Sequence, residues 1–177
     1  LGFKNAIVTD EHMRTSDPDI YACGDAVQTL NRVSRTYTNI ALAGPANKQG
    51  RIVADNMAGI GSVYKGALGS SVLKVFDLTV ASTGLNERLT RMNNMEYEKI
   101  IISPASHALY YPGGSAMTLK LLFKKDVHKI IGAQIVGKDG VDKRIDVLST
   151  AIYAGIKAND LKDIDLAYAP PYSSAKD

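Results

Sequence analysis

The chain has 177 residues, of which 45% are hydrophobic, so it can form one domain or two small ones with a sizeable core. Its 21 basic and 18 acidic residues leave a net charge of +3, and no basic run is interleaved with aromatic residues, so we expect no nucleic-acid partner. No apolar run approaches the roughly 18 residues that a membrane helix needs, and the N-terminus lacks a signal-peptide pattern. The single cysteine cannot form an internal disulfide, which favours a reducing cytoplasm.

The first part of the chain predicts a strand and a helix. Residues 20–23 form an apolar run between a proline and a glycine, which predicts a buried strand. Cys23 would then be a small buried hydrophobe rather than a redox cysteine. Apolar side chains in residues 46–57 fall on or near one helical face, and Pro45 suits the first turn, so we expect a helix here.

The second part has a different pattern, and the glycine-rich segment 59–69 predicts a boundary before it. We expect strands at residues 72–81, 97–102, 115–123 and 129–136, the last two as an antiparallel hairpin. Asn86 can cap a short helix. Residues 141–152 have the spacing of an amphipathic helix with Asp139 as a possible cap, and 161–164 predict a second short helix. Strands with helices grouped around them favour an α+β fold for residues 70–177.

The motifs resemble one known family. The run MRTSDPDIYACGDA, followed by ALAGPANKQGRIVADNMAG, resembles the closing segment of the FAD domain in pyridine nucleotide–disulfide oxidoreductases. The runs VFDLTVASTGLNE, HALYYPGG, LKLLFKKDVHKIIGAQIVGKDGVDKRIDVLSTAI and DLAYAPPYSSAKD resemble the C-terminal dimerisation domain of that family. The YYPG and APPYS versions are similar to the branch of coenzyme A disulfide reductases, NADH oxidases and NADH peroxidases. Several motifs in one order make the resemblance far more specific than the GDA motif alone.

This resemblance implies a two-part fold. Residues 1–60 are expected to be the C-terminal segment of an FAD-binding domain, an incomplete α/β unit, and residues 61–70 a linker. Residues 71–177 are expected to be a dimerisation domain, an antiparallel sheet flanked by helices. The family binds FAD and NAD(P)H through GxGxxG loops, and this chain has none, so these loops and the redox cysteine are expected upstream. We therefore expect a fragment that is inactive and free of cofactor by itself.

Asp25 is the first candidate cofactor-binding residue. By resemblance, the aspartate of the GDA motif hydrogen-bonds a ribityl hydroxyl of FAD. A carboxylate at the C-terminal end of a strand faces the crevice where nucleotides bind in open α/β sheets, and Gly24 lets the backbone approach closely. From the local sequence alone, an aspartate capping a turn is the simpler interpretation, and the family context favours the flavin role.

The start of the predicted helix is the second candidate. Its free N–H groups and positive dipole end would point at an anion, and in this family that helix points at the pyrimidine edge of the flavin. Ala43 and Ala46 are small enough to permit contact, and Asn47 could reach the flavin or a substrate. Lys48 could also reach it, although we favour an ordinary surface role for this residue.

Tyr111 and Tyr172 are the candidate catalytic residues. By resemblance to coenzyme A disulfide reductases, the tyrosine of APPYS and one tyrosine of YYPG reach across a dimer to the partner's redox cysteine and flavin. A phenol can donate a proton to a departing thiolate, although interface packing would also explain these residues. Tyr110 is the rival of Tyr111, because neighbours in an extended segment point to opposite faces. The family's other mechanism, a His–Glu pair, is not carried over because the last histidine is His128.

The function that we expect belongs to a longer parent. It is an FAD-dependent NAD(P)H oxidoreductase that reduces coenzyme A disulfide or persulfide, to which this chain contributes a homodimer interface and part of the FAD site. The alternative within the family is an NADH oxidase or peroxidase, whose cysteine cycles through a sulfenic acid. An alternative of another class is a stand-alone, non-catalytic dimerisation module. The three histidines show no metal-ligand spacing, so we expect no metal site.

Overall fold

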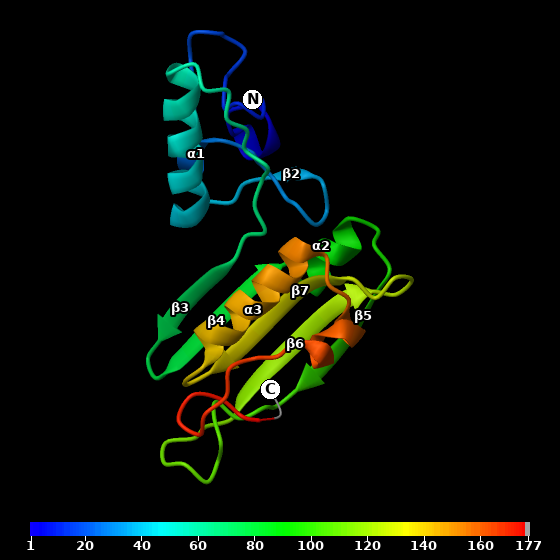
Figure 1. Ribbon diagram of the computed structural model, residues 1–177. Helices are drawn as coiled ribbons and strands as arrows, with labels where there is room; N and C mark the ends of the chain where they lie inside the picture. Colours follow the sequence, from blue (N-terminus) through cyan, green and yellow to red (C-terminus); the bar gives the residue numbers. More distant parts are fainter. Residues whose placement is uncertain (176–177) are drawn as a thin grey trace. The chain divides into compact units, whose positions relative to one another are not determined.

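The computed structural model describes residues 1–175, and the chain divides into two compact units, residues 1–69 and residues from 70 onward (Figure 1). Among the described residues, no helix is both long enough and apolar enough to cross a membrane.

The first unit has little regular structure besides one long helix. Its elements are two 3₁₀ turns, η1 (Phe3–Asn5) and η2 (Gly24–Ala26), the two-residue antiparallel strands β1 (Thr29–Leu30) and β2 (Tyr37–Thr38), and the helix α1 (Ala43–Met57). The helix has the position that the sequence predicts, and Pro45 lies in its first turn. The helix packs against η2, so the GDA motif and the start of α1 belong to one structural cluster.

The predicted buried strand at residues 20–23 is wrong. Only an isolated bridge between Arg14 and Tyr21 is present there, and Cys23 is a free, exposed cysteine rather than a buried one. A strand is stable only when a neighbour pairs with its backbone and covers one face. In the first unit, the segment pairs only at this one bridge, where Thr15 donates its N–H to the Ile20 carbonyl and Ala22 donates its N–H to the Met13 carbonyl, and Ile20 remains 53% exposed.

The second unit is an α+β domain, as the sequence predicts. Its elements are β3 (Ser71–Val75), β4 (Leu78–Gly84), α2 (Glu87–Met92), β5 (Tyr97–Ile102), β6 (Met117–Lys124), β7 (Ile130–Gly137), α3 (Val141–Ala154) and η3 (Ala158–Asp163). The five strands form one antiparallel sheet in the order β3-β4-β7-β6-β5, and α3 crosses one face of it (Figure 1). The predicted hairpin is confirmed as β6 and β7.

The single strand predicted at 72–81 is two strands. The chain reverses at Phe76 and Asp77, and Phe76 adopts a left-handed backbone with φ of 51°. No glycine or proline marks this turn, so the apolar residues on both sides read as one continuous run. Phe76 is 96% exposed at the tip of the hairpin.

Helix α3 supplies the apolar layer against the sheet. Val141, Ile145, Leu148 and Ile152 are buried, as their spacing predicts, and the helix packs on β4 and β7. Asp139 does not cap it: the N-cap is Gly140, whose φ of 73° is in the left-handed region that glycine tolerates. No side-chain hydrogen bond caps this helix start.

Helix α2 is held at the edge of this unit by its cap and by one carboxylate. The Asn86 side chain accepts a hydrogen bond from the backbone N–H of Leu89, so the predicted cap is confirmed. Glu87 accepts hydrogen bonds from Tyr97, Lys99 and Lys120, and from Arg91 one turn later. The hydrogen bonds from Tyr97, then from Lys99 and Lys120, lower the pKa of Glu87 to about 2.

Candidate functional site

The first candidate cluster lies in the first unit, where η2 meets the start of α1. Gly24 has φ of +80°, and a methyl group added to it would meet only the Cβ of Ala46, at 3.9 Å. The structure therefore brings Gly24 and Ala46 together. Asp25 is exposed, and its backbone carbonyl accepts a hydrogen bond of 2.9 Å from the Asn39 side chain.

The beginning of α1 is open to an incoming group. The N-cap residue, Leu42, makes no side-chain capping bond, so the first backbone N–H groups of the helix have no partner from a cap. Ala43 and Asn47 are exposed on the first two turns, and Ala46 is half-buried. An uncapped helix start with small exposed residues suits the binding of a negatively charged or electron-rich edge.

Gln49 organises this cluster, and the sequence analysis missed it. Its side chain is 1% exposed, accepts a 2.7 Å hydrogen bond from the backbone N–H of Gly24, and donates one of 3.1 Å to Thr29. Gln49 thus fixes the backbone of the GDA motif to α1. The available signal was a polar residue three positions after Ala46, on the inward face of the helix.

The second candidate cluster lies in the second unit, where the loop 107–111 meets the segment 167–173. The backbone N–H of Ala108 donates to the Ser173 carbonyl at 3.1 Å. The buried Ser173 hydroxyl donates to the Ala167 carbonyl at 3.0 Å. The Ala108–Ser173 bond joins the HALYYPGG and LAYAPPYS motifs, although they lie about 60 positions apart in the sequence.

Within this cluster the structure pairs Tyr110 with Tyr168. Their hydroxyl groups are 2.9 Å apart, and the hydrogen bond from Tyr110, followed by burial, raises the pKa of Tyr168. Tyr168 was not among the sequence candidates. It could have been found as a second tyrosine in the segment that supplied Tyr172.

The two sequence candidates take other positions in the cluster. The Tyr111 ring lies edge-on to the His107 ring, with centroids 5.9 Å apart, and Tyr111 is 43% exposed. Tyr172 is 72% exposed. The structure places both on the surface of the same loop cluster and records no contact between them within the described residues.

A buried arginine holds the base of the tyrosine loop. Arg144 of α3 donates to the carbonyls of Gly140, Ala105 and Ser106 at 3.1–3.3 Å, and it is only 8% exposed. A guanidinium that binds three main-chain carbonyls fixes their relative positions. The loop that carries Tyr110 and Tyr111 therefore starts from a rigid base. No group of three or more potential metal-ligating side chains occurs in the described part of the chain.

An antiparallel unit with exposed phenols, preceded by a glycine–aspartate turn packed on a helix start, is the arrangement that the family resemblance of the sequence motifs predicts. Comparisons with known families agree. The dimerisation-domain model of the pyridine nucleotide-disulphide oxidoreductases matches residues 70–177, and the model of the pyridine nucleotide-disulphide oxidoreductases matches residues 1–50. The chain belongs to the pyridine nucleotide-disulphide oxidoreductase family.

Two individual relatives match this chain over its whole length. The chain is 39% identical, over its whole length, to a coenzyme A disulfide reductase of Staphylococcus epidermidis, of which it spans 40%. It matches the reduced CoADR-RHD protein of Bacillus anthracis with 54% identity and a TM-score of 0.96, covering all of this chain and 32% of that one.

Two further solved structures show how far the similarity extends. A NAD-dependent persulfide reductase from A. fulgidus matches with 45% identity and a TM-score of 0.94, over 97% of this chain and 32% of that one. A water-forming NADH oxidase from Lactobacillus brevis matches with 29% identity and a TM-score of 0.91, over 97% and 38%. The chain thus spans about 40% or less of the length of these relatives.

Proposed function

We propose that this chain is the C-terminal part of an FAD-dependent NAD(P)H oxidoreductase that reduces coenzyme A disulfide or a coenzyme A persulfide. The observation that carries this proposal is a whole-chain match at 54% identity to the CoADR-RHD protein, which includes both candidate clusters. For a disulfide, the overall reaction is RSSR′ plus NAD(P)H plus a proton, giving RSH, R′SH and NAD(P)⁺.

The division of labour within the chain is part of this proposal. Residues 1–60 would be the closing segment of the FAD domain, 61–70 a linker, and 71–177 the dimerisation domain. The separation into compact units at residues 69 and 70 supports this division. So does the family model for the dimerisation domain, which matches from residue 70.

The first cluster fits part of an FAD site. The open space at Gly24, the exposed Asp25 carboxylate and the uncapped start of α1 are suited to a polyhydroxyl chain beside a flavin ring. Gly24, Asp25, Ala43, Ala46 and Asn47 would hold the cofactor. Bound there, FAD would supply electron transfer between the nicotinamide and the sulfur substrate. Because these residues form only part of the site, we expect the 177-residue chain to purify without colour.

The second cluster would supply protons to sulfur. Reductive cleavage of a disulfide releases a thiolate, and a nearby phenol stabilises it by donating a hydrogen bond or a proton. Tyr111 and Tyr172, both exposed, are the donors that the family motifs suggest. The Tyr110–Tyr168 pair is a second candidate, because one phenol can donate to the other and leave the second proton directed outward. The raised pKa of Tyr168 keeps that phenol protonated at neutral pH.

A homodimer would bring this cluster to the partner's redox cysteine. The sheet face opposite α3 supports such an interface, because it carries apolar side chains that this chain leaves half-exposed: Leu73, Val75, Leu78 and Val136. Exposed apolar surface of this kind marks interaction sites. Sedimentation equilibrium should give a dimer mass that Leu78→Glu lowers, and a monomer at all concentrations would contradict this part of the proposal. A reducing cytoplasm suits both the free Cys23 and the thiol products.

The runner-up is an NADH oxidase or peroxidase. The lower identity to the water-forming oxidase, 29% against 54% and 45%, favours sulfur chemistry over oxygen chemistry. A stand-alone dimerisation module is the alternative outside enzymes. Stoichiometric flavin absorbance in the purified chain would contradict the fragment interpretation.

The decisive experiment uses the full-length parent. NADH and NADPH oxidation would be followed with coenzyme A disulfide under argon, and then in air without it. Rapid anaerobic oxidation with release of two thiols per nicotinamide supports the reductase, whereas oxidation that requires only air moves the protein to the oxidase branch.

Phenylalanine variants would then separate the phenols. Tyr111→Phe, Tyr172→Phe, Tyr110→Phe and Tyr168→Phe each remove one hydroxyl and keep the ring. The variant that lacks the proton donor should have a kcat lower by about 10²-fold or more. Tyr153→Phe, on the exposed face of α3, is the matched control and should be unaffected. If kcat falls only in Tyr110→Phe and Tyr168→Phe, the proton donor is the hydrogen-bonded pair Tyr110–Tyr168.

A further inference from the structure

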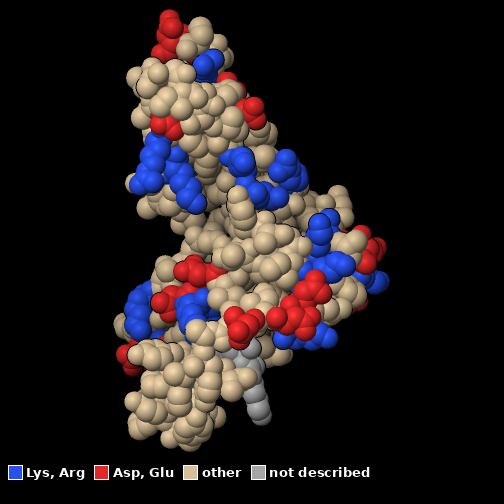
Figure 2. Space-filling model, in the orientation of Figure 1, with Lys and Arg blue, Asp and Glu red and all other residues tan. Residues whose placement is uncertain are grey.

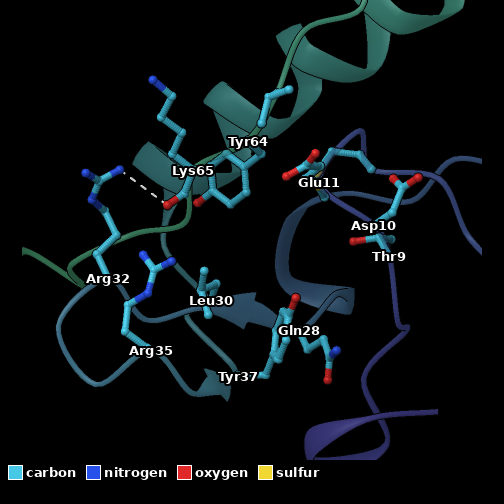
Figure 3. A pocket seen from close by; sticks show the side chains of 12 residues that line it. Thr9, Asp10, Glu11, Gln28, Leu30, Arg32, Arg35, Tyr37, Tyr64 and Lys65 are labelled. Atoms are coloured by element: carbon cyan, nitrogen blue, oxygen red, sulfur yellow. Dashed lines mark hydrogen bonds between the residues drawn. The ribbon is translucent and has the colours of Figure 1, made fainter.

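The first unit contains a preformed pocket of about 350 Å³ that none of the candidate flavin residues lines. Its walls come from three segments: residues 9–13, the β1–β2 hairpin (28–37) and residues 63–65. Figure 3 shows the side chains that face it. All three segments belong to one compact unit.

Main-chain hydrogen bonds hold the three walls together. The backbone N–H of Tyr64 donates to the Glu11 carbonyl at 2.8 Å, and that of Arg32 donates to the Ala67 carbonyl at 3.0 Å. The buried Asn56 side chain donates to the carbonyls of both His12 and Ser62. These bonds order the segments without a ligand, so a ligand would enter a pocket that is already shaped.

Charge is distributed asymmetrically around the pocket. Arg32, Arg35 and Lys65 lie on one side, while Asp10 and Glu11 lie on the other (Figure 3). Basic side chains also gather on the face of this unit near β2 in Figure 2. Within residues 1–175, no ion pair joins a carboxylate to Arg35 or Lys65.

The tyrosines of the pocket add neutral groups. The Tyr64 hydroxyl is buried and lies beside Gln49 but makes no hydrogen bond of good geometry. Burial raises the pKa of this phenol, although Gln49 acts in the opposite direction, so the hydroxyl remains a donor at neutral pH. Tyr37 offers a half-exposed ring at the rim, where a planar group could stack.

From these features we infer that the pocket binds a hydroxylated phosphate monoester such as a sugar phosphate, with the phosphate on the side of Arg32, Arg35 and Lys65 and the hydroxyls toward Asp10 and Glu11. Guanidinium groups match the planar faces of phosphate oxygens and bind them bidentately. Carboxylates accept hydrogen bonds from hydroxyls and repel a second anion, which excludes a ligand charged at both ends. Free sugar phosphates and nucleotides share this chemistry.

The test uses the 177-residue chain and three probes: ribose 5-phosphate, AMP and inorganic phosphate. Calorimetric titration should show that ribose 5-phosphate binds more tightly than inorganic phosphate, because only the ester reaches the carboxylates. Tighter binding of AMP would identify a nucleotide that stacks on Tyr37, and equal binding would identify a sugar phosphate. Equal affinity for inorganic phosphate, or no binding of any probe at about 10 mM, would overturn the inference.

Two double variants distinguish binding in the pocket from nonspecific electrostatic attraction. The double variant Arg35→Ala/Lys65→Ala should weaken binding of ribose 5-phosphate by about tenfold. Arg51→Ala/Lys125→Ala removes the same charge from exposed positions outside the pocket and should change it by less than about twofold. Equal losses in both would mean nonspecific attraction. NMR tests the location without any variant. When ribose 5-phosphate is added to the unmodified chain, the amide chemical shifts that change should be confined to residues 30–37 and 63–65.

Discussion

The two units of this chain are stabilised in different ways. Among the described residues, the first unit buries only three hydrophobic side chains: Ala6, Met13 and Val27. The second unit buries sixteen, most of them between the five-stranded sheet and α3. The first unit instead depends on buried polar residues that bind its main chain, Gln49, Asn56 and Asn31. A closed apolar core and a set of specific hydrogen bonds respond differently to mutation.

The largest effect should come from the apolar core of the second unit. Ile135 lies in the central strand β7 and is completely buried. Ile135→Ala should lower the free energy of unfolding of this unit by about 2–5 kcal/mol, since both transfer energy and packing are lost. Hydrogen exchange measured by mass spectrometry should show faster exchange in β4, β6 and β7.

The same measurement tests whether the units are independent. Exchange in α1 should remain unchanged in Ile135→Ala, and a matching rise there would mean that the units unfold as one. Ile101→Ala, at a position 58% exposed, is the control for loss of an isoleucine and should have little effect.

In the first unit, one hydrogen-bonding side chain should have a comparable though smaller effect. Gln49→Ala leaves the N–H of Gly24 and the hydroxyl of Thr29 without their partner. We expect a loss of about 1–3 kcal/mol, because unsatisfied buried polar groups retain their desolvation cost. Faster hydrogen exchange of the Gly24 amide would report the lost hydrogen bond directly. Lys48→Ala, next to Gln49 on α1, should leave that exchange rate unchanged.

The cap of α2 should contribute less. Asn86→Ala removes the bond to the Leu89 N–H and should cost about 0.5–2 kcal/mol. Denaturant unfolding of the second unit measures this loss. Asn86→Asp retains an acceptor at the cap and should keep most of the stability, and equal losses in the two variants would contradict a capping role.

The smallest effect at neutral pH should be electrostatic. The pKa of Glu87 is lowered from 4.5 to about 2, mainly by hydrogen bonds from Tyr97, Lys99 and Lys120. A lowered folded-state pKa contributes stability that is present above pH 4.5 and is lost as the pH falls toward 2. The second unit should therefore lose stability as the pH falls from 4.5 to about 2.

Glu87→Gln is the variant that isolates this contribution. It should flatten the dependence of the unfolding midpoint on pH between about 4.5 and 2. High salt should reduce the difference, because the carboxylate lies near the surface. An unchanged slope in the variant would assign the acid sensitivity to other carboxylates.

Local patterns in the sequence were enough to predict much of the second unit. The strand at 97–102, the β6–β7 hairpin, the buried face of α3 and the Asn86 cap all follow from residues within one element or one turn. The same reasoning identified α1 in the first unit. In the candidate site, family motifs pointed to Gly24 and Ala46, which the structure places together.

Only the tertiary structure decided the features that depend on a partner distant in the sequence. The segment 20–23 has the composition of a strand but pairs only at the single bridge between Arg14 and Tyr21, and Cys23 is exposed. Gln49 binds Gly24 across 25 positions, and Tyr168 binds Tyr110 across 58. Periodicity and capping signals extend over one or two turns of chain, whereas a hydrogen bond between distant side chains exists only after the backbone has brought them within about 3 Å.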